Sequence, residues 1–391
     1  MIPYGKHFVD EDDIEAVIAV LKSNNLTQGP MIEEFEKNFS NYVGSKYAVA
    51  VSSGTAALHL SSLALDVNNT SFALTSPISF VSTANCIKFC GGDIGFVDID
   101  LNTLNISSSK LEEFLQKSDK KVDVILPVHF SGLSADMKKI HELSKLYNFK
   151  IIEDAAHALG SSYDNKKKIG SCCYSDITIF SLHPVKSIAA GEGGVITTNS
   201  DEIYRKLIRL RSHGINKLDD TFLEFDQAFT GNLKNPWYYE MQDLGYHYRI
   251  TDIQCALANS QLKKLDNFIT ERKKLANNYN KIISAYENIN IHQDTNKMSS
   301  ANHLFILNID FNKYKISRAE LMYSLRQSDI ITQVHYLPIP YHPYYRKQLS
   351  KKYNIFNASR YYQTCLSIPL FYKLSFEQQE LIIDKINTLL K

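Results

Sequence analysis

The sequence predicts an α/β fold, in which helices flank a largely parallel sheet, together with a smaller α+β domain. Short apolar segments alternate with longer segments whose apolar residues recur every three or four positions, as in strands that alternate with amphipathic helices. A length of 391 residues exceeds what one hydrophobic core usually serves, so we expect a large and a smaller domain. Ligands of open parallel sheets bind at the carboxyl ends of the strands, and these ends are where we look for a site.

The first 64 residues predict two helices, a strand and a third helix. Asp10 begins the first helix, and a second amphipathic helix follows the break at residues 24–30. The strand over residues 47–51 then leads through a turn of small residues into a helix over 56–64. A helix N-terminus offers unpaired N–H groups to an anion, so Gly54 and Thr55 are candidate phosphate ligands. A well-capped helix without a ligand is the competing interpretation.

The middle of the chain continues the alternation of strands and helices, and one predicted strand there ends with two acidic residues. Strands are predicted over 72–75, 94–97, 122–128 and 150–154, and helices over 80–89 and 135–147, the last with Ile140, Leu143 and Leu146 inward. Asp154 follows an apolar strand, where an unpaired carboxylate is costly. It is therefore either salt-bridged or the counter-ion of a cationic ligand group.

Lys186 lies alone between two apolar strands, in the segment from Thr178 to Thr198. Gly191, Gly193 and Gly194 follow it, and glycine lets the main chain approach a bulky ligand closely. An ordinary hairpin with an exposed lysine is the competing interpretation. Taken with Asp154, the lysine favours a cofactor site, because pyridoxal-phosphate enzymes pair a lysine with an acid that faces the pyridine nitrogen.

Residues 215–246 lack a clear periodicity, and a long loop of this kind is usually functional or disordered. Trp237, with the two tyrosines after it, is expected either near a partner's active site or as a cover over the large domain. A long helix from Thr251 suits a bridge between two domains, which we predict at 1–250 and 251–391.

The C-terminal part predicts the smaller α+β domain, with strands over 303–309 and 331–334 and helices over 318–327 and 376–390. Between them, residues 335–346 are dense in Pro, Tyr and His. Such a segment is either a sugar- or nucleotide-binding loop or a rigid spacer.

Composition excludes several classes of function. A net charge of +1 gives no reason to expect a nucleic-acid partner. No apolar run reaches membrane length and the N-terminus does not resemble a signal peptide, so we expect a cytoplasmic protein without a membrane partner. The six cysteines form no C-x-x-C pair, and no metal site is expected. Neither the Rossmann nor the P-loop spacing is present.

Five separated motifs identify a family. SGTAAL at 53–58, TSPISFV at 75–81, EDAAHALG at 153–160, FSLHPVK at 180–186 and GEGG at 191–194 closely resemble the DegT/DnrJ/EryC1/StrS family of pyridoxal-phosphate-dependent nucleotide-sugar aminotransferases. The resemblance runs nearly end to end. Within the family, residues 77–85, 235–245 and 333–339 resemble the 4-aminotransferases of the pseudaminic acid pathway.

This resemblance implies a fold type I pyridoxal-phosphate transferase and a role for each matching residue. Lys186 matches the lysine that binds the cofactor covalently, and Asp154 the acid that keeps the pyridine nitrogen protonated. Phe80 matches the aromatic residue stacked on the cofactor ring, although by itself it reads as helix core. The remaining matches are His157, which faces the phenolic oxygen, and the phosphate contacts Gly54, Thr55 and Ser181.

His247 departs from the family pattern, which usually has an asparagine that reaches across a homodimer to the partner's cofactor phosphate. Histidine can still donate a hydrogen bond there. The candidate substrate contacts are His183, Arg249, His335 and Tyr336; His183 either touches substrate or only shapes the turn around Lys186.

The implied reaction is a ping-pong transamination in which Lys186 shuttles the proton. L-glutamate would donate its amino group to C4 of a UDP-4-keto-6-deoxy-N-acetylhexosamine, UDP-2-acetamido-2,6-dideoxy-β-L-arabino-hex-4-ulose. The product would be UDP-4-amino-4,6-dideoxy-N-acetyl-β-L-altrosamine.

Three alternatives stay open. They are amination at C3 or C4 of another dTDP, GDP or UDP sugar, a related sugar dehydratase, and a non-catalytic regulator. Lys186 argues against the dehydratase, which the resemblance associates with histidine at this position, and the intact motifs argue against the regulator.

Overall fold

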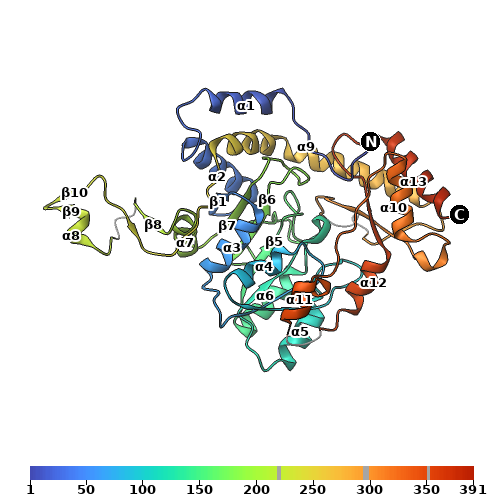
Figure 1. The fold of residues 1–391 in the computed structure, drawn as a ribbon, viewed down its shortest axis with the longest axis horizontal. Coiled ribbons are helices and arrows are strands. Elements are labelled where there is room, and N and C mark those ends of the chain that lie inside the picture. Colours follow the sequence, from blue (N-terminus) through green and yellow to red (C-terminus); the bar gives the residue numbers. More distant parts are fainter. Residues whose placement is uncertain (218–221, 294–298, 350–352) are drawn as a thin grey trace.

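The computed structural model describes residues 1–217, 222–293, 299–349 and 353–391. A seven-stranded sheet in the order β1-β7-β6-β5-β4-β2-β3 forms its centre (Figure 1). In that order the strands are Tyr47–Val51, Gly194–Thr198, Ile177–Ser181, Lys150–Asp154, Val124–Leu126, Phe72–Thr75 and Asp93–Phe96. The prediction of an α/β fold with a largely parallel sheet is confirmed.

One strand runs against the others. β7 pairs antiparallel with both β1 and β6, whereas β6, β5, β4, β2 and β3 pair parallel. A parallel neighbour needs a long crossover connection, usually a helix, and the elbow that joins β6 to β7 contains none. β7 therefore turns back alongside β6, with Lys186 in the elbow between the two strands.

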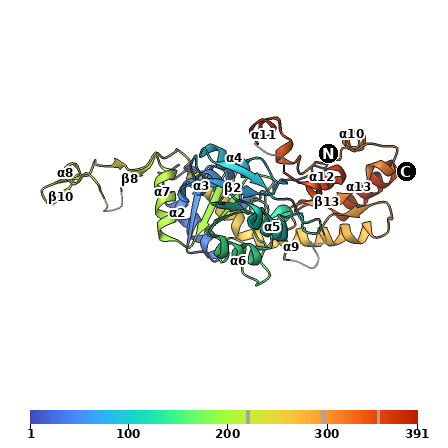
Figure 2. The same cartoon turned by 90° about the horizontal axis from the view of Figure 1, so that it is seen from below.

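Helices cover both faces of the sheet (Figures 1 and 2). Buried residues of α2 and of the first half of α9 pack on one face, and those of α3, α4 and α7 on the other. The helices are α1 Glu11–Leu21, α2 Pro30–Val43, α3 Gly54–Ala64, α4 Ser82–Phe89, α5 Ser108–Lys117, α6 Met137–Tyr147, α7 Asp201–Arg211, α8 Phe225–Ala228, α9 Asp252–Ile283, α10 Arg318–Gln327, α11 Pro343–Gln348, α12 Phe356–Thr364 and α13 Phe376–Leu389.

Local sequence signals explain where these helices begin. Asp10 caps α1 in a capping box with Asp13, as Thr251 does for α9 with Gln254. Ser53 caps α3 and accepts a hydrogen bond from the Ala56 N–H. The first turn of α3 therefore starts directly at the end of β1.

The C-terminal part has its own antiparallel sheet of β12 (Asn290–Ile291), β13 (Phe305–Asn308) and β14 (Cys365–Ile368). The second half of α9 packs with α10 and α13 in a separate hydrophobic core. α9 thus joins two cores, as expected for a bridging helix. The N-terminal residue Ile2 pairs with Ile330 in this part. The division of the chain at residues 250 and 251 stays a prediction.

Several expected elements differ from the structure. The helix predicted from residue 80 begins at Ser82, which leaves Phe80 before it and 58% exposed. Leu146 was expected inward but is 71% exposed, because it lies six residues after Ile140 and so on another side of α6. The strand predicted over 331–334 is only a single bridge from Gln333. The predicted strand over 122–128 is shorter, and α5, α7 and α12 were not expected.

The segment expected to be a long loop forms an arm, which we define as residues 215–217 and 222–245. It carries α8 and the short strands β8 (Ile215–Asn216), β9 (Phe229–Thr230), β10 (Leu233–Lys234) and β11 (Glu240–Met241). The arm projects away from the rest of the chain in both views (Figures 1 and 2). Trp237, on the arm, is 73% exposed and does not cover the large sheet. Residues 218–221 of this segment lie outside the described residues.

Candidate active site

Lys186 lies in the elbow between β6 and β7. Its backbone N–H donates to the His183 carbonyl at 2.8 Å, which closes a tight turn. Burial lowers the pKa of the Lys186 ammonium group to about 8, and the nearby Asp154 carboxylate opposes this shift. A substantial fraction of the amine is therefore neutral near pH 8, as a nucleophile or general base requires.

Asp154 ends β5 and is 4% exposed. Its Oδ2 accepts from the Thr83 hydroxyl at 2.6 Å, and its Oδ1 accepts from the Ala156 N–H at 3.1 Å. No ion pair to this carboxylate occurs in the described part of the chain. Of the two interpretations of Asp154, a salt bridge within the chain is therefore not found, and a counter-ion for a ligand remains.

The turn before α3 is held against Ser181 and β7. A Cβ on Gly194 would lie 2.4 Å from the Ser53 carbonyl oxygen, and a Cβ on Gly54 would lie 3.1 Å from the Ser181 Cβ. Only glycine allows this close approach. The N–H groups of Gly54 and Thr55 occupy the first helical positions and have no partner among the described residues. The structure thus gathers the three predicted phosphate ligands at one helix N-terminus.

A group of buried aromatic side chains lies beside Lys186. The His157 Nδ1 accepts from the Ser131 N–H at 3.4 Å, so its Nε2 carries the proton and donates to the Tyr336 hydroxyl at 3.2 Å. The His157 ring centre is 4.4 Å from that of His303, and the His335 Nδ1 is 2.9 Å from the Ser367 hydroxyl. Sequence reasoning did not single out His303.

These histidines are neutral. Burial, and then the positive charge of Lys186, lower the pKa of His157 well below its usual range and that of His335 to about 3. Burial also lowers the pKa of His303 well below its usual range, with His157 and Lys186 adding to the shift. The exposed Phe80 ring lies 6.3 Å from the Tyr336 ring at the edge of this group.

Three predicted residues lie apart from this group. His183 is exposed, and His247 is exposed with its ring 5.4 Å from that of His213. Arg249 lines a groove of about 980 Å³ between α2 and α7, where its Nη1 donates to the Ser212 hydroxyl at 3.4 Å. Arg249 pairs with Val51 at the end of β1. The backbone at Arg249 therefore runs beside the turn between β1 and α3, but its side chain is not part of the Lys186 group.

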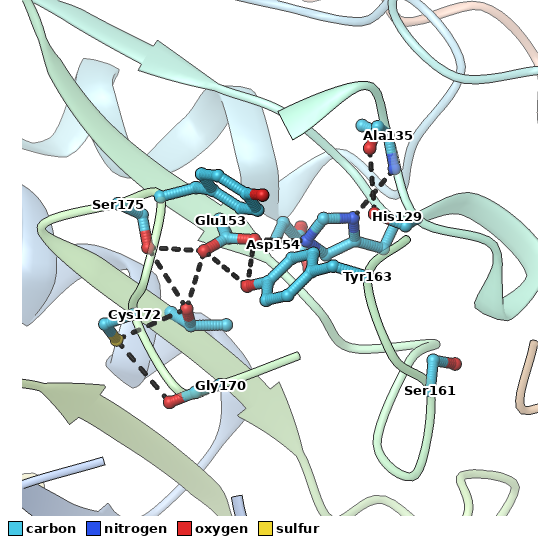
Figure 3. A network of polar contacts seen from close by, with 12 residues as sticks. His129, Ala135, Glu153, Asp154, Ser161, Tyr163, Gly170, Cys172 and Ser175 are labelled. Carbon is cyan, nitrogen blue, oxygen red and sulfur yellow. Dashed lines mark hydrogen bonds and ion pairs between the residues drawn. The ribbon is translucent and has the colours of Figure 1, made fainter. Parts of the chain in front are cut away.

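Glu153, the residue before Asp154 on β5, lies at the centre of a polar network that the sequence did not reveal (Figure 3). Glu153 is fully buried and accepts from His129 Nε2 at 2.7 Å, Tyr163 Oη at 2.7 Å and Thr178 Oγ1 at 3.0 Å. A further hydrogen bond comes from Ser175. The His129 Nδ1 accepts from the Ala135 N–H at 3.1 Å, which leaves the Nε2 proton for Glu153.

This network keeps Glu153 ionised. Burial opposes ionisation, but the hydrogen bonds from His129, Ser175 and Tyr163 together hold the pKa of Glu153 below its ordinary value. The sequence offered one signal for His129, which follows the strand β4 much as Asp154 ends the strand β5. In the structure the two positions are neighbours, and the backbone N–H of His129 donates to the Asp154 carbonyl at 3.0 Å. Thr83 also lay inside a motif, one helical turn after Phe80.

Comparison with known proteins identifies this arrangement. The model of the DegT/DnrJ/EryC1/StrS aminotransferase family matches residues 8–387 of this chain. The chain belongs to the DegT/DnrJ/EryC1/StrS aminotransferase family.

Full-length relatives agree with this family. A UDP-4-amino-4,6-dideoxy-N-acetyl-β-L-altrosamine transaminase of Campylobacter jejuni is 36% identical over 100% of this chain and 98% of its own. The spore coat polysaccharide biosynthesis protein SpsC of Bacillus subtilis is also 36% identical, over 100% of this chain and 97% of its own.

Solved structures give the same picture. Helicobacter pylori PseC, an aminotransferase of pseudaminic acid biosynthesis, has a TM-score of 0.87 and 29% identity, and covers 100% of this chain and 99% of its own. The pyridoxal-phosphate form of a putative sugar aminotransferase, Spr1654, from Streptococcus pneumoniae has a TM-score of 0.85 and 26% identity, with 99% and 98% covered. This family member is therefore a nucleotide-sugar aminotransferase that depends on pyridoxal phosphate.

The residues of this sugar aminotransferase fit that cofactor. The free N–H groups of the α3 turn suit a phosphate, the glycines leave room for close approach, and the buried Asp154 has no cation of its own. Among the described residues, no cluster of His, Cys, Asp or Glu could hold a metal ion, and no helix is long and apolar enough to cross a membrane.

Proposed function

We propose that this aminotransferase moves the amino group of L-glutamate to C4 of a UDP-4-keto-6-deoxy-N-acetylhexosamine, in the pathway to pseudaminic acid. The observation that carries the amino transfer is a lysine whose pKa is lowered to about 8 near a buried carboxylate that forms no ion pair among the described residues. The choice of sugar is supported by the full-length likeness to the altrosamine transaminase and to PseC.

In this proposal pyridoxal phosphate, when bound, supplies an electron sink for the carbon that loses its proton. Lys186 would hold the cofactor through its Nζ and would carry the proton at that atom during the reaction. Asp154 would be the counter-ion of the protonated pyridine nitrogen, and the Thr83 hydroxyl holds its carboxylate in place. The Gly54–Thr55 turn and Ser181 would hold the phosphate, with His247 of a second copy, while His157 would hold the phenolic oxygen and Phe80 the ring.

A neutral, hydrogen-bonding wall suits a sugar. His335 and Tyr336 are predicted substrate contacts, and the histidines of the group carry no charge that would select an anion. Hydroxyl and carbonyl groups of a sugar ring can therefore exchange water for these side chains without the desolvation of an unpaired charge. His183 stays a predicted contact at the rim.

We also propose that the enzyme is a homodimer that shares its active sites. His247 and Arg249 lie outside the Lys186 group of their own chain, with Arg249 in a groove beside the base of the arm. The Arg249 Nε is buried without a hydrogen-bond partner among the described residues. The position of these two residues and the unpartnered Arg249 Nε both support contacts between this segment and a second copy of the chain.

The decisive experiment incubates the loaded enzyme with glutamate and a panel of ketosugars and identifies the product by mass and NMR. The panel contains the UDP-4-keto sugar above, its C5 epimer and dTDP-4-keto-6-deoxyglucose. We expect the altrosamine product from the first compound. Amination of only another sugar would refute the substrate assignment and support a different nucleotide-sugar aminotransferase; no amination of any would refute the activity.

A further inference from the structure

The N-terminal segment lies across the candidate active site. The Ile2 N–H donates to the Asp329 carbonyl at 2.6 Å, and the Ile331 N–H donates to the Ile2 carbonyl at 2.9 Å. Two residues on, the Leu370 N–H donates to the Tyr4 carbonyl at 3.1 Å. The backbone on both sides of Tyr4 is therefore tied to the C-terminal part of the chain.

The same segment also contacts the Lys186 elbow. A side-chain carbon at Gly5 would lie 3.5 Å from the Cβ of Val185, the residue directly before Lys186. The N-terminal segment thus joins the C-terminal part to the elbow, and Tyr4 lies between the two points of contact. Its position is set by backbone hydrogen bonds rather than by its own side chain.

The Tyr4 side chain faces the neutral aromatic group. Its ring lies 5.5 Å from the His335 ring, tilted by 53°. Burial, and next the nearby Tyr4 phenol, raise the pKa of Tyr336, whose hydroxyl is 3.2 Å from His157 Nε2. Tyr4 contacts His335, whose ring lies 4.8 Å from that of Tyr336, and Tyr336 contacts His157, so these side chains form a continuous row.

The Tyr4 hydroxyl has no hydrogen-bond partner among the described residues, although the side chain is half-buried and burial raises its pKa. The hydroxyl is not fully buried, so it is free to donate to a ligand that supplies an acceptor. Tyrosine also offers an apolar ring to the C–H face of a sugar.

We propose that Tyr4 is a specificity-determining residue that hydrogen-bonds the hexose ring of the nucleotide sugar. The inference rests on the proposed function, because it assigns a contact to the same substrate. An uncharged oxygen-bearing ring is favoured over the amino-acid donor, since His335, the ring that Tyr4 contacts, is neutral and gives a carboxylate no counter-charge. Tyr4 should then matter for the sugar half of the reaction and not for the glutamate half.

The test is Tyr4→Phe, which removes the hydroxyl but keeps the ring, with the exposed Tyr323→Phe on α10 as the matched control. Loss of one hydrogen bond of about 1.4 kcal/mol predicts a roughly ten-fold higher KM for the ketosugar. The rate at which glutamate converts the loaded enzyme, measured without sugar, should not change. Calorimetry with cofactor-free protein should show roughly ten-fold weaker binding of the aminated nucleotide sugar.

An unchanged KM and product affinity in Tyr4→Phe would overturn the inference, as would an equal slowing of both half-reactions. Thermal unfolding of each variant verifies that the fold is retained. If the wild type rejects the UDP-4-keto sugar, the proposed function fails by itself. The Tyr4 comparison is then made with dTDP-4-keto-6-deoxyglucose and, by calorimetry, with UDP, which lacks the hexose and should bind both proteins equally.

Discussion

The Glu153 network and the arm differ in where their side chains find partners. The network is satisfied within this chain, whereas the arm exposes large apolar side chains. Glu153 is fully buried, and donors from four other residues satisfy it. On the arm, Leu244 is 79% exposed and Trp237 is 73% exposed, although both are large and apolar. The first region is complete within one chain, whereas exposed apolar side chains of this density are typical of an interface with another.

This difference separates what one chain does alone from what needs a partner. Asp154 follows Glu153 on β5, whereas His247, also predicted to contact a cofactor, lies near the base of the arm. Substitutions in the first region should therefore change activity or the stability of one chain, whereas substitutions in the second should change the dissociation constant of the dimer.

The largest effect is expected for Lys186→Ala. Without the amine, neither the covalent bond nor the proton transfer can form, so turnover should fall by at least about 10³-fold while the fold is retained. The exposed Lys167→Ala serves as the control. Activity, circular dichroism and borohydride trapping of the cofactor measure this. A variant that still trapped the cofactor and turned over normally would refute the role of Lys186.

Glu153→Gln should damage the complete region itself. The neutral amide has one acceptor oxygen in place of two, so charge-assisted hydrogen bonds from His129 and the hydroxyls are lost, which lowers the free energy of unfolding by about 2–4 kcal/mol. The exposed Glu113→Gln, which breaks only a surface pair with Lys117, should leave it nearly unchanged. Denaturant unfolding compares the two. Equal values would mean that the network adds nothing to stability.

Lys186 and Asp154 were predictable from local sequence, whereas the Glu153 network beside them was not, and the reasons are physical. A strand that ends in Asp154 and a glycine-rich elbow with Lys186 are short-range patterns, and parallel strand ends meet at one edge. The donors to Glu153 come from separate segments of the chain, and no periodicity encodes them. The direction of β7 and the exposure of Leu146 were missed because apolar spacing alone does not specify strand direction or the exact buried face of a helix.

Trp237→Ala tests the arm as an interface. If the indole anchors a second copy, its loss should weaken dimerisation by about 2 kcal/mol or roughly 30-fold, without lowering the stability of the monomer. Leu381→Ala, an exposed apolar residue on α13, is the control. Sedimentation over a dilution series measures the dissociation constant. An unchanged constant would remove Trp237 from the interface.

The smallest effect concerns acid stability and His303. The folded-state pKa of His303 is lowered, so below about pH 6.5 the unfolded chain binds a proton that the folded chain does not, and stability falls as pH falls. His303→Asn should reduce this slope by up to about 1.4 kcal/mol per pH unit between roughly pH 6 and 5. Unfolding free energies across this range measure the slope. An identical slope would mean that His303 is protonated in the folded protein.

The two acids at the end of β5 are consecutive residues, and successive side chains of a strand face opposite sides of the sheet. A slip of β5 by one residue against β4 and β6 would therefore exchange Glu153 and Asp154. The donors around Glu153 oppose that slip, because they are placed for its carboxylate and would meet the shorter Asp154 instead. Side chains outside the Lys186 group thus fix the register of β5, and with it which of the two acids lies near Lys186.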